Sequence, residues 1–140
     1  MYLLDSDTLS HLHAGHQRVI TNLHAIHDSE VGTTIVTKIE ILSARHRFLL
    51  TANDGEQLLK AQHWLRLSEQ LLSALLIVHV ETAAAGEFDR LRRVRKLKRI
   101  GRADLLIASI TLANDATLVT RNLRHFQQVP NLRVVNWVDT

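Results

Sequence analysis

Cysteine is absent from this chain of 140 residues, and proline and aromatic residues are scarce, with one Pro, two Trp, one Tyr and three Phe. The missing cysteine excludes disulfide bonds, thiolate metal sites and cysteine nucleophiles, and it fits a reducing cytoplasm. Because aromatics are few, the core must be built from Leu, Ile, Val and Ala, as in helices packed on a sheet. For this length we expect one domain spanning 1–140.

Long apolar runs are also missing, so no segment approaches the length of a membrane span. The first ten residues, MYLLDSDTLS, contain acids where a signal peptide would need a basic start and a longer apolar run. We therefore expect a soluble cytosolic protein that does not enter a membrane.

Basic residues are concentrated in one segment. The chain has 17 Lys and Arg against 14 Asp and Glu, but 90–102 alone has eight basic residues and no acid. The rest of the chain therefore has nine basic residues against fourteen acids. A basic stripe on an otherwise acidic domain indicates a polyanionic partner, although a solvated helix face would have the same composition.

Short apolar or β-branched runs alternate along the chain with segments of helical periodicity. The expected strands are 2–4, 33–36, 76–80, 117–120 and 132–135. This alternation predicts a doubly wound α/β fold with a parallel sheet.

The expected helices are marked by capping residues and apolar stripes. Thr37 has capping-box spacing to Glu40 and predicts a helix through about Leu50. A long helix follows, whose Leu58, Leu65 and Leu72 face a core, and the two form a helical hairpin. Thr82 caps a helix whose C-terminal end lies near Gly101, and the apolar run LLIASITLA predicts a buried helix after it.

Three acids and one amide stand where expected strands give way to helices: Asp5, Glu40, Asp104 and Asn122. Ligands of doubly wound folds bind at the carboxyl ends of the strands, so all four side chains can face one cleft. Mg²⁺ and Mn²⁺ prefer such oxygen ligands. Each residue can also be an ordinary helix-capping residue, but a buried, unpaired carboxylate is unfavourable unless a cation compensates it.

Three segments resemble the PIN-domain ribonucleases, specifically the VapC-type toxins of bacterial toxin–antitoxin pairs. YLLDSDTLSHL is similar to the family's opening, and TIVTKIEIL resembles its second motif. The segment IGRADLLIASITLANDATLVTRNLRHFQQVPNLRVVNW is similar to its C-terminal third. The resemblance covers essentially the whole chain and implies a PIN-like three-layer α/β/α fold, with a central parallel sheet of four to five strands and a helical hairpin.

By this resemblance the protein would be a Mg²⁺- or Mn²⁺-dependent endoribonuclease. Asp5, Glu40 and Asp104 map to the metal-binding acids, and Asn122 lies near the fourth position in a supporting role. Water would attack a phosphodiester in line and leave a 5′-phosphate and a 3′-hydroxyl. The substrate would be a structured RNA such as tRNA. The implied partners are a small VapB-type antitoxin that occludes the acidic cleft and a second copy of the chain, within a larger toxin–antitoxin assembly.

Two positions depart from the family's pattern. Many members have Asp at the fourth position, where this chain has Asn122, so one metal is a safer expectation than two. Asp7 stands where members often have Asn, and it either restores the charge or caps the helix. Thr37, Thr120 and Arg121 lie near strand ends and are accessory candidates for contacting water or phosphate.

The basic stripe supplies the candidates for RNA binding: Arg92, Arg93, Lys96 and Arg99. Nine histidines raise the alternative of a histidine metal site. His11 and His13 would point to different faces of a helix, and no acidic partner is evident for any imidazole. We therefore expect the histidines at surface or partly buried positions.

Two other functions compete with a ribonuclease. YLLDSDTL also suggests a phosphatase of the haloacid dehalogenase type, but Leu9 and Leu105 stand where that class needs Thr or Val and a second acid. The non-enzymatic alternative is an inactive PIN domain that binds RNA or antitoxin and lost catalysis with the fourth acid.

Overall fold

The structure is a computed structural model that describes residues 1–27 and 30–140. The described residues contain one parallel sheet of five strands in the order β3-β2-β1-β4-β5. The strands are β1 Tyr2–Leu4, β2 Val31–Thr34, β3 Leu76–Val78, β4 Thr117–Val119 and β5 Arg133–Val135. The α-helices are α1 Ser6–His13, α2 Gln17–Ala25, α3 Ile35–Leu50, α4 Gly55–Ser73, α5 Thr82–Leu91, α6 Arg102–Ala113 and α7 Leu123–Phe126. A 3₁₀ helix, η1, covers Arg95–Leu97.

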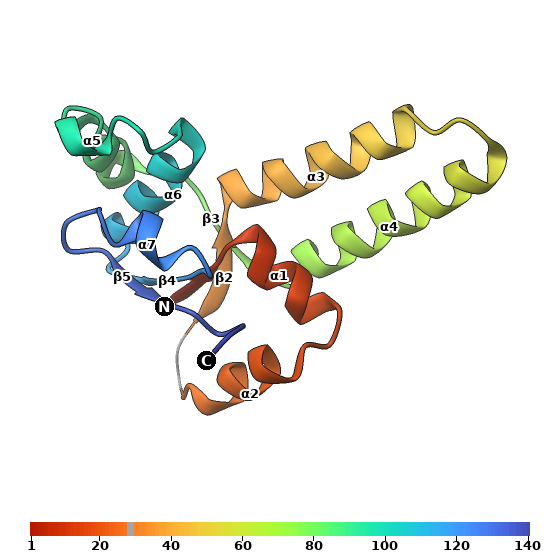
Figure 1. The fold of residues 1–140 in the computed structure, drawn as a ribbon, viewed down its shortest axis with the longest axis horizontal. Coiled ribbons are helices and arrows are strands. Elements are labelled where there is room, and N and C mark those ends of the chain that lie inside the picture. The colour runs from red at the N-terminus through yellow and green to blue at the C-terminus, as the bar shows by residue number, and fades with distance from the viewer. Residues whose placement is uncertain (28–29) are drawn as a thin grey trace.

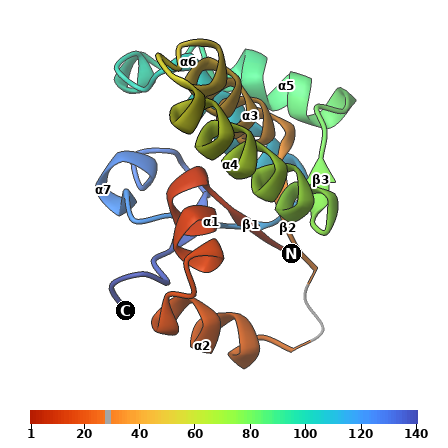
Figure 2. The same cartoon turned by 90° about the vertical axis from the view of Figure 1, so that its right-hand side faces the viewer.

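Helices cover both faces of the sheet, which confirms the predicted three-layer α/β architecture. Figure 2 shows α3, α4, α5 and α6 on one side of the strands and α1 and α2 on the other. Neighbouring residues of β1 and β4 alternate between the faces, as the pleat requires. Leu3 and Leu118 pack toward the side of α5 and α6, whereas Leu4 and Val119 pack with residues of α1, α2 and the C-terminal segment. Both faces of the central strands are thus buried.

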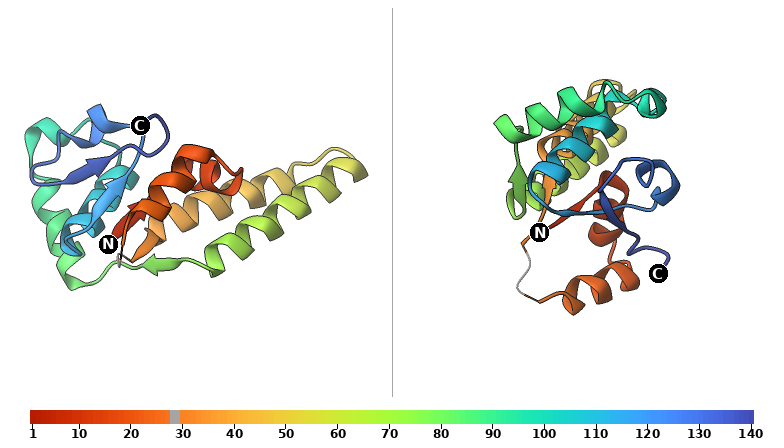
Figure 3. Two further views of the ribbon diagram at one scale, coloured as in Figure 1. Left: turned by 90° about the horizontal axis from the view of Figure 1, so that it is seen from below. Right: turned by 90° about the vertical axis from the view of Figure 1, so that its left-hand side faces the viewer.

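The helical hairpin predicted from the sequence is formed by α3 and α4 and extends away from the sheet (Figures 1 and 3). Asp54 caps α4, its Oδ1 accepting a hydrogen bond from the backbone N–H of Gln57 at 2.8 Å. The expectation that the leucine stripe faces a core is correct only near the sheet. Leu72 is 3% exposed, but Leu58, at the far end of the hairpin, is 46% exposed.

Three of the expected boundaries that involve helix ends were wrong. The strand predicted at 33–36 is β2, which ends at Thr34, and Thr34 rather than Thr37 caps the next helix through its hydroxyl at 3.1 Å from the N–H of Thr37. Thr82 is the first residue of α5 and Glu81 is its N-cap. The helix expected to reach Gly101 ends at Leu91, and Gly101 is the N-cap of α6.

No helix among residues 1–27 and 30–140 is long and apolar enough to span a membrane.

Candidate active site

Asp5 is fixed at the carboxyl end of the central strand β1. Its backbone N–H donates to the carbonyl oxygen of Val119 on β4 at 3.1 Å, which ties the two strand ends together. Its Oδ1 caps α1 by accepting a hydrogen bond from the N–H of Thr8 at 2.8 Å. The hydroxyl of Thr8 in turn donates to the same carbonyl of Val119 at 3.3 Å. The expected cap is therefore present, and Oδ2 of Asp5 accepts no hydrogen bond from the described residues.

Glu40 lies in α3, on the side of the sheet that α6 also covers. Burial of its carboxyl is the largest cause that raises its pKa, followed by the negative charges of Asp104 and then Asp5. The residue as a whole is exposed, so the burial reflects crowding around the carboxyl rather than insertion into the core. The structure therefore brings the three acids of the predicted site into one electrostatic neighbourhood.

Asp104 occupies the first turn of α6 and makes a contact that the sequence did not reveal. Its Oδ2 lies 3.0 Å from Nε2 of His125, which is part of the short helix α7. The ring of His125 also packs edge-on against the buried Phe126, with ring centroids 5.2 Å apart. The expectation that no imidazole has an acidic partner was wrong, because α7 brings His125 to an acid 21 residues away in sequence.

Asn122 lies in the turn between β4 and α7. Its backbone N–H donates to the hydroxyl of the buried Thr120 at 3.0 Å, which fixes the turn. The residue is the N-cap of α7, yet its side chain makes no capping hydrogen bond. The exposed amide therefore lies directly before the short helix that holds His125.

Asp7 and Arg121 belong to a separate ion-pair network. Asp7 Oδ2 lies 3.9 Å from Nη1 of Arg121 and 3.7 Å from Nδ1 of His11. Arg121 binds both carboxylate oxygens of Asp139, at 3.1 and 3.2 Å. Hydrogen bonding to Asp139 is the main cause that raises the pKa of Arg121. Asp7 is not among the charges that raise the pKa of Glu40, and its carboxylate faces Arg121 and His11.

The chemistry of the donor set fits a hard divalent cation, although the carboxylates do not yet converge as ligands. Asp5, Glu40 and Asp104 offer oxygen donors only, and their mutual repulsion is the kind that a cation relieves. Among residues 1–27 and 30–140, no three His, Asp or Glu side chains lie close enough to surround an ion. Rotation of side chains would have to close the site, which a cation would favour.

Thr37 is buried and accepts a hydrogen bond from the hydroxyl of Thr34 at 3.3 Å, so its side chain stabilises the start of α3.

The basic segment is not one continuous helical stripe. Its eight basic residues are all exposed, but they are distributed over the end of α5, a turn, η1 and the start of α6. Within the described part of the chain, Arg93, Lys96 and Arg99 have no acidic partner, whereas Arg92 pairs with Asp89 at 3.1 Å.

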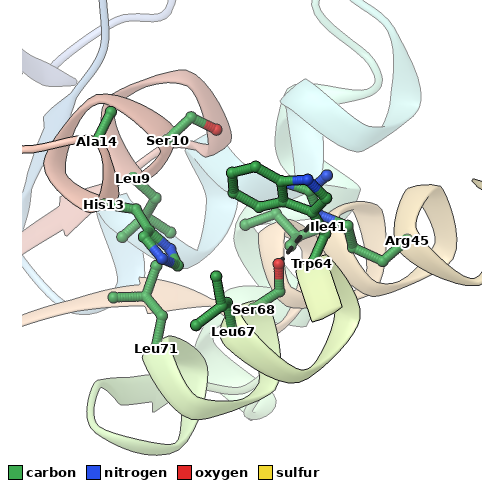
Figure 4. A pocket seen from close by; sticks show the side chains of 10 residues that line it. All are labelled: Leu9, Ser10, His13, Ala14, Ile41, Arg45, Trp64, Leu67, Ser68 and Leu71. Carbon is green, nitrogen blue, oxygen red and sulfur yellow. Dashed lines mark hydrogen bonds between the residues drawn. The ribbon is translucent and has the colours of Figure 1, made fainter. Parts of the chain in front are cut away.

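An apolar groove of about 360 Å³ lies between α1 and the helical hairpin. Figure 4 shows His13 of α1 facing Leu67 and Leu71 of α4 across the groove. At one end, the guanidinium of Arg45 stacks over Trp64, 5.3 Å from the ring centroid. Sequence reasoning did not identify this groove, because it depends on how α1 and the hairpin pack.

Comparison with known proteins matches residues 2–132 to the model of the PIN domain family. The chain is 41% identical over 68 residues to Ribonuclease VapC2 of Rickettsia felis, covering 47% of this chain and 51% of that protein. It is 29% identical over 85 residues to the tRNA(fMet)-specific endonuclease VapC of Salmonella typhimurium, covering 59% of this chain and 64% of that protein. These matches span about half to two thirds of the length of both relatives. The crystal structure of VapBC2 from R. felis bound to a promoter DNA fragment superposes with a TM-score of 0.77 and 26% identity, over 97% of this chain and 98% of that chain.

Proposed function

Since the chain belongs to the PIN domain family, we propose that it is a Mg²⁺- or Mn²⁺-dependent endoribonuclease, the toxin of a toxin–antitoxin pair. The observation that carries the proposal is the neighbourhood of Glu40, whose pKa is raised by burial and by the charges of Asp104 and Asp5. Carboxyl groups with raised pKa values are typical of functional sites, and ligands of doubly wound folds bind at the carboxyl ends of the strands. Because the chain belongs to the PIN family, this function takes the place of a phosphatase of the haloacid dehalogenase type.

The three acids would hold the divalent cation, and the polar residues around them would position the reactants. A bound cation would neutralise charge on the scissile phosphate and favour ionisation of the attacking water. Asp5 keeps one carboxylate oxygen for this task while the other caps α1. His125 orients the carboxylate of Asp104 through the contact at 3.0 Å, and the amide of Asn122 orients water or phosphate beside it.

The proposed substrate is RNA, and its phosphates would be attracted by the exposed basic side chains of Arg92, Arg93, Lys96 and Arg99. The name of the Salmonella relative, a tRNA(fMet)-specific endonuclease, supports structured RNA as the class. Hydrolysis would leave a 5′-phosphate and a 3′-hydroxyl.

The proposed partner is a small VapB-type antitoxin. Similar solved structures are VapBC complexes, including one from R. felis and one from S. typhimurium. The groove between α1 and the hairpin supports this partner, because an apolar groove of this kind accepts the apolar face of an amphipathic helix. Leu9 of α1 and Ile41 of α3 line it, and α1 begins directly after Asp5. An antitoxin seated there could therefore extend a basic side chain toward the acids. The homodimer stays a prediction.

Cleavage by the purified protein tests the function. Structured RNA should be cut in the presence of Mg²⁺ or Mn²⁺, and the chelator EDTA or Asp104→Asn should abolish cleavage. Sequencing of the cleaved ends would identify the bond and the end chemistry. RNA binding without cleavage under all metal conditions would favour the inactive PIN domain, the alternative that Asn122 at the fourth position supports.

A further inference from the structure

A second cavity lies beside α6, between the end of α5, the segment around η1 and the first turn of α6. Its volume is about 490 Å³, within the range of sites for small ligands. Resting on the proposed ribonuclease function, we propose that this cavity binds an unpaired nucleotide of the RNA near the scissile bond. Neither the acids nor the groove for the antitoxin includes any of its residues.

The rim of the cavity is cationic. Arg92, Lys98 and Arg102 line it and come from three separate places in the fold. Among the described residues, no acid pairs with Lys98 or Arg102, while Arg92 has Asp89 at 3.1 Å. At least two positive charges therefore converge on the cavity without a protein counter-ion. A phosphate group would compensate them, and Arg102 could bind it through two nitrogens.

The floor of the cavity is apolar. The buried side chains of Leu97, Ile100 and Leu105 form it together with the half-buried ring of Phe88. A cationic rim over an apolar and aromatic floor matches the two parts of a nucleotide, since the phosphate meets the charges and the base covers the floor. A base in a duplex is stacked and paired, so only an unpaired base could enter.

The cavity is close to Asp104 because both lie at the first turn of α6. Arg102 and Leu105 line the cavity, and Asp104 between them faces His125. Residues two apart on a helix point to different sides, so Arg102 and the carboxylate of Asp104 lie on two sides of α6. A single strand that crosses the N-terminus of α6 could reach both. An acidic peptide would also meet the cationic rim, but it would leave the apolar floor uncovered.

Two matched double variants test the proposal. Lys98→Ala with Arg102→Ala removes two charges that line the cavity. Arg93→Ala with Lys96→Ala removes two exposed charges of the same segment that lie outside the cavity lining; because these two also attract RNA phosphates in the proposed function, this control measures the diffuse electrostatic contribution of the segment. Binding of a fluorescein-labelled single-stranded RNA of about ten nucleotides is measured as a function of salt. All proteins also have Asp5→Asn, which should prevent cleavage and lies directly after β1, outside the lining of the cavity.

We expect the cavity variant to bind the RNA about 10-fold more weakly than the control variant, and its salt slope to fall by about 1.4, for two phosphate contacts on a single strand. Phe88→Leu, which keeps an apolar side chain but removes the aromatic face, should weaken binding about 5-fold with little change in the salt slope. Annealing the RNA to its complement should remove the difference between the two double variants.

Equal losses for the two double variants would refute the cavity and leave a diffuse electrostatic contribution of the segment. Unchanged RNA binding together with a weaker complex with the antitoxin would instead assign the cavity to an acidic peptide. Failure of the cavity proposal can be distinguished from failure of the proposed ribonuclease function. If the chain without the Asp5→Asn change cleaves RNA but the double variants lose binding equally, only the subsite fails; if that chain never cleaves, the ribonuclease proposal fails.

Discussion

Replacing His125 should weaken metal binding without unfolding the protein. The imidazole is 3.0 Å from Oδ2 of Asp104, and the two side chains are 25% and 38% exposed. A hydrogen bond to a charged group contributes about 1.5–3 kcal/mol, and this partial exposure favours the lower end. About 1.4 kcal/mol corresponds to a factor of ten, which matches the lower end of the loss seen when a partner of a metal ligand is removed. We therefore expect His125→Leu to raise the dissociation constant for Mn²⁺ about tenfold.

The assay is direct titration with Mn²⁺, followed by electron paramagnetic resonance, beside RNA cleavage as a function of metal concentration. His125→Gln keeps an N–H donor at a similar reach and should recover part of the affinity, whereas His46→Leu, at an exposed position of α3, should change nothing. Thermal unfolding checks that His125→Leu remains folded. If that variant binds Mn²⁺ as tightly as the unmodified chain, or if Gln recovers no affinity, His125 does not position Asp104.

The remaining predictions concern charge and packing. Because the fold raises the pKa of Glu40 above 4.5, the free energy of unfolding of the metal-free protein should fall as pH rises from the unfolded pKa through the folded one. Glu40→Gln removes this dependence and should raise the free energy of unfolding at pH 7, and with it Tm, by less than about 1 kcal/mol after solvent screening. Millimolar Mn²⁺ should raise the Tm of the unmodified chain and much less that of Glu40→Gln, since an ion that binds the native state stabilises it; equal shifts would contradict the site. Gly32→Ala should destabilise the fold by about 1–3 kcal/mol, because an added Cβ would clash with the backbone oxygen of Leu76. Gly86→Ala, with open space around it, should instead stabilise α5 by about 0.5–1 kcal/mol. Chemical denaturation measures both changes.

The elements that are predicted best from the sequence are those whose composition allows only one structural role. The run at Tyr2–Leu4 and the apolar helix α6 can only be buried, and a strand that ends just before Asp5 follows from the capping residues. The end of β2 was misplaced because Ile35 and Val36 favour strands by propensity, yet the hydroxyl of Thr34 caps a helix at that point. Capping by one side chain therefore decides what propensity leaves open.

The break after α5 has a tertiary cause. A continuous helix would turn Leu97 about 120° away from Leu91, since six residues make 1.67 turns. The chain instead forms η1, so that both leucines and Ile100 pack in one cluster. Breaking the helix also spreads basic residues that would repel one another at spacings of three and four. No glycine or proline marks this break in the sequence.

The contact of His125 with Asp104 depends on a tertiary arrangement that local patterns do not encode. The two residues are on α7 and α6, and their approach depends on how the turn after β4 packs. The sequence order of the acids, by contrast, predicts that they face one edge of the sheet, because the carboxyl ends of the parallel strands share that edge. In the structure the charges of Asp104 and Asp5 raise the pKa of Glu40, while among residues 1–27 and 30–140 no three such side chains come close enough to surround an ion.

The three acids differ in the hydrogen-bond partners that the protein provides for their carboxylates. Asp5 accepts a hydrogen bond from the N–H of Thr8, and Asp104 has His125. Glu40 has no hydrogen-bond donor among the described residues and lies in the field of the other two, so its ionised form is the one that destabilises the metal-free protein. The sheet order places β1 between β2 and β4, so the helix after β2 begins next to the strand end that Asp5 follows. Of the three acids, Glu40 is therefore the one whose charge a bound cation would compensate most, if the proposed metal site is correct.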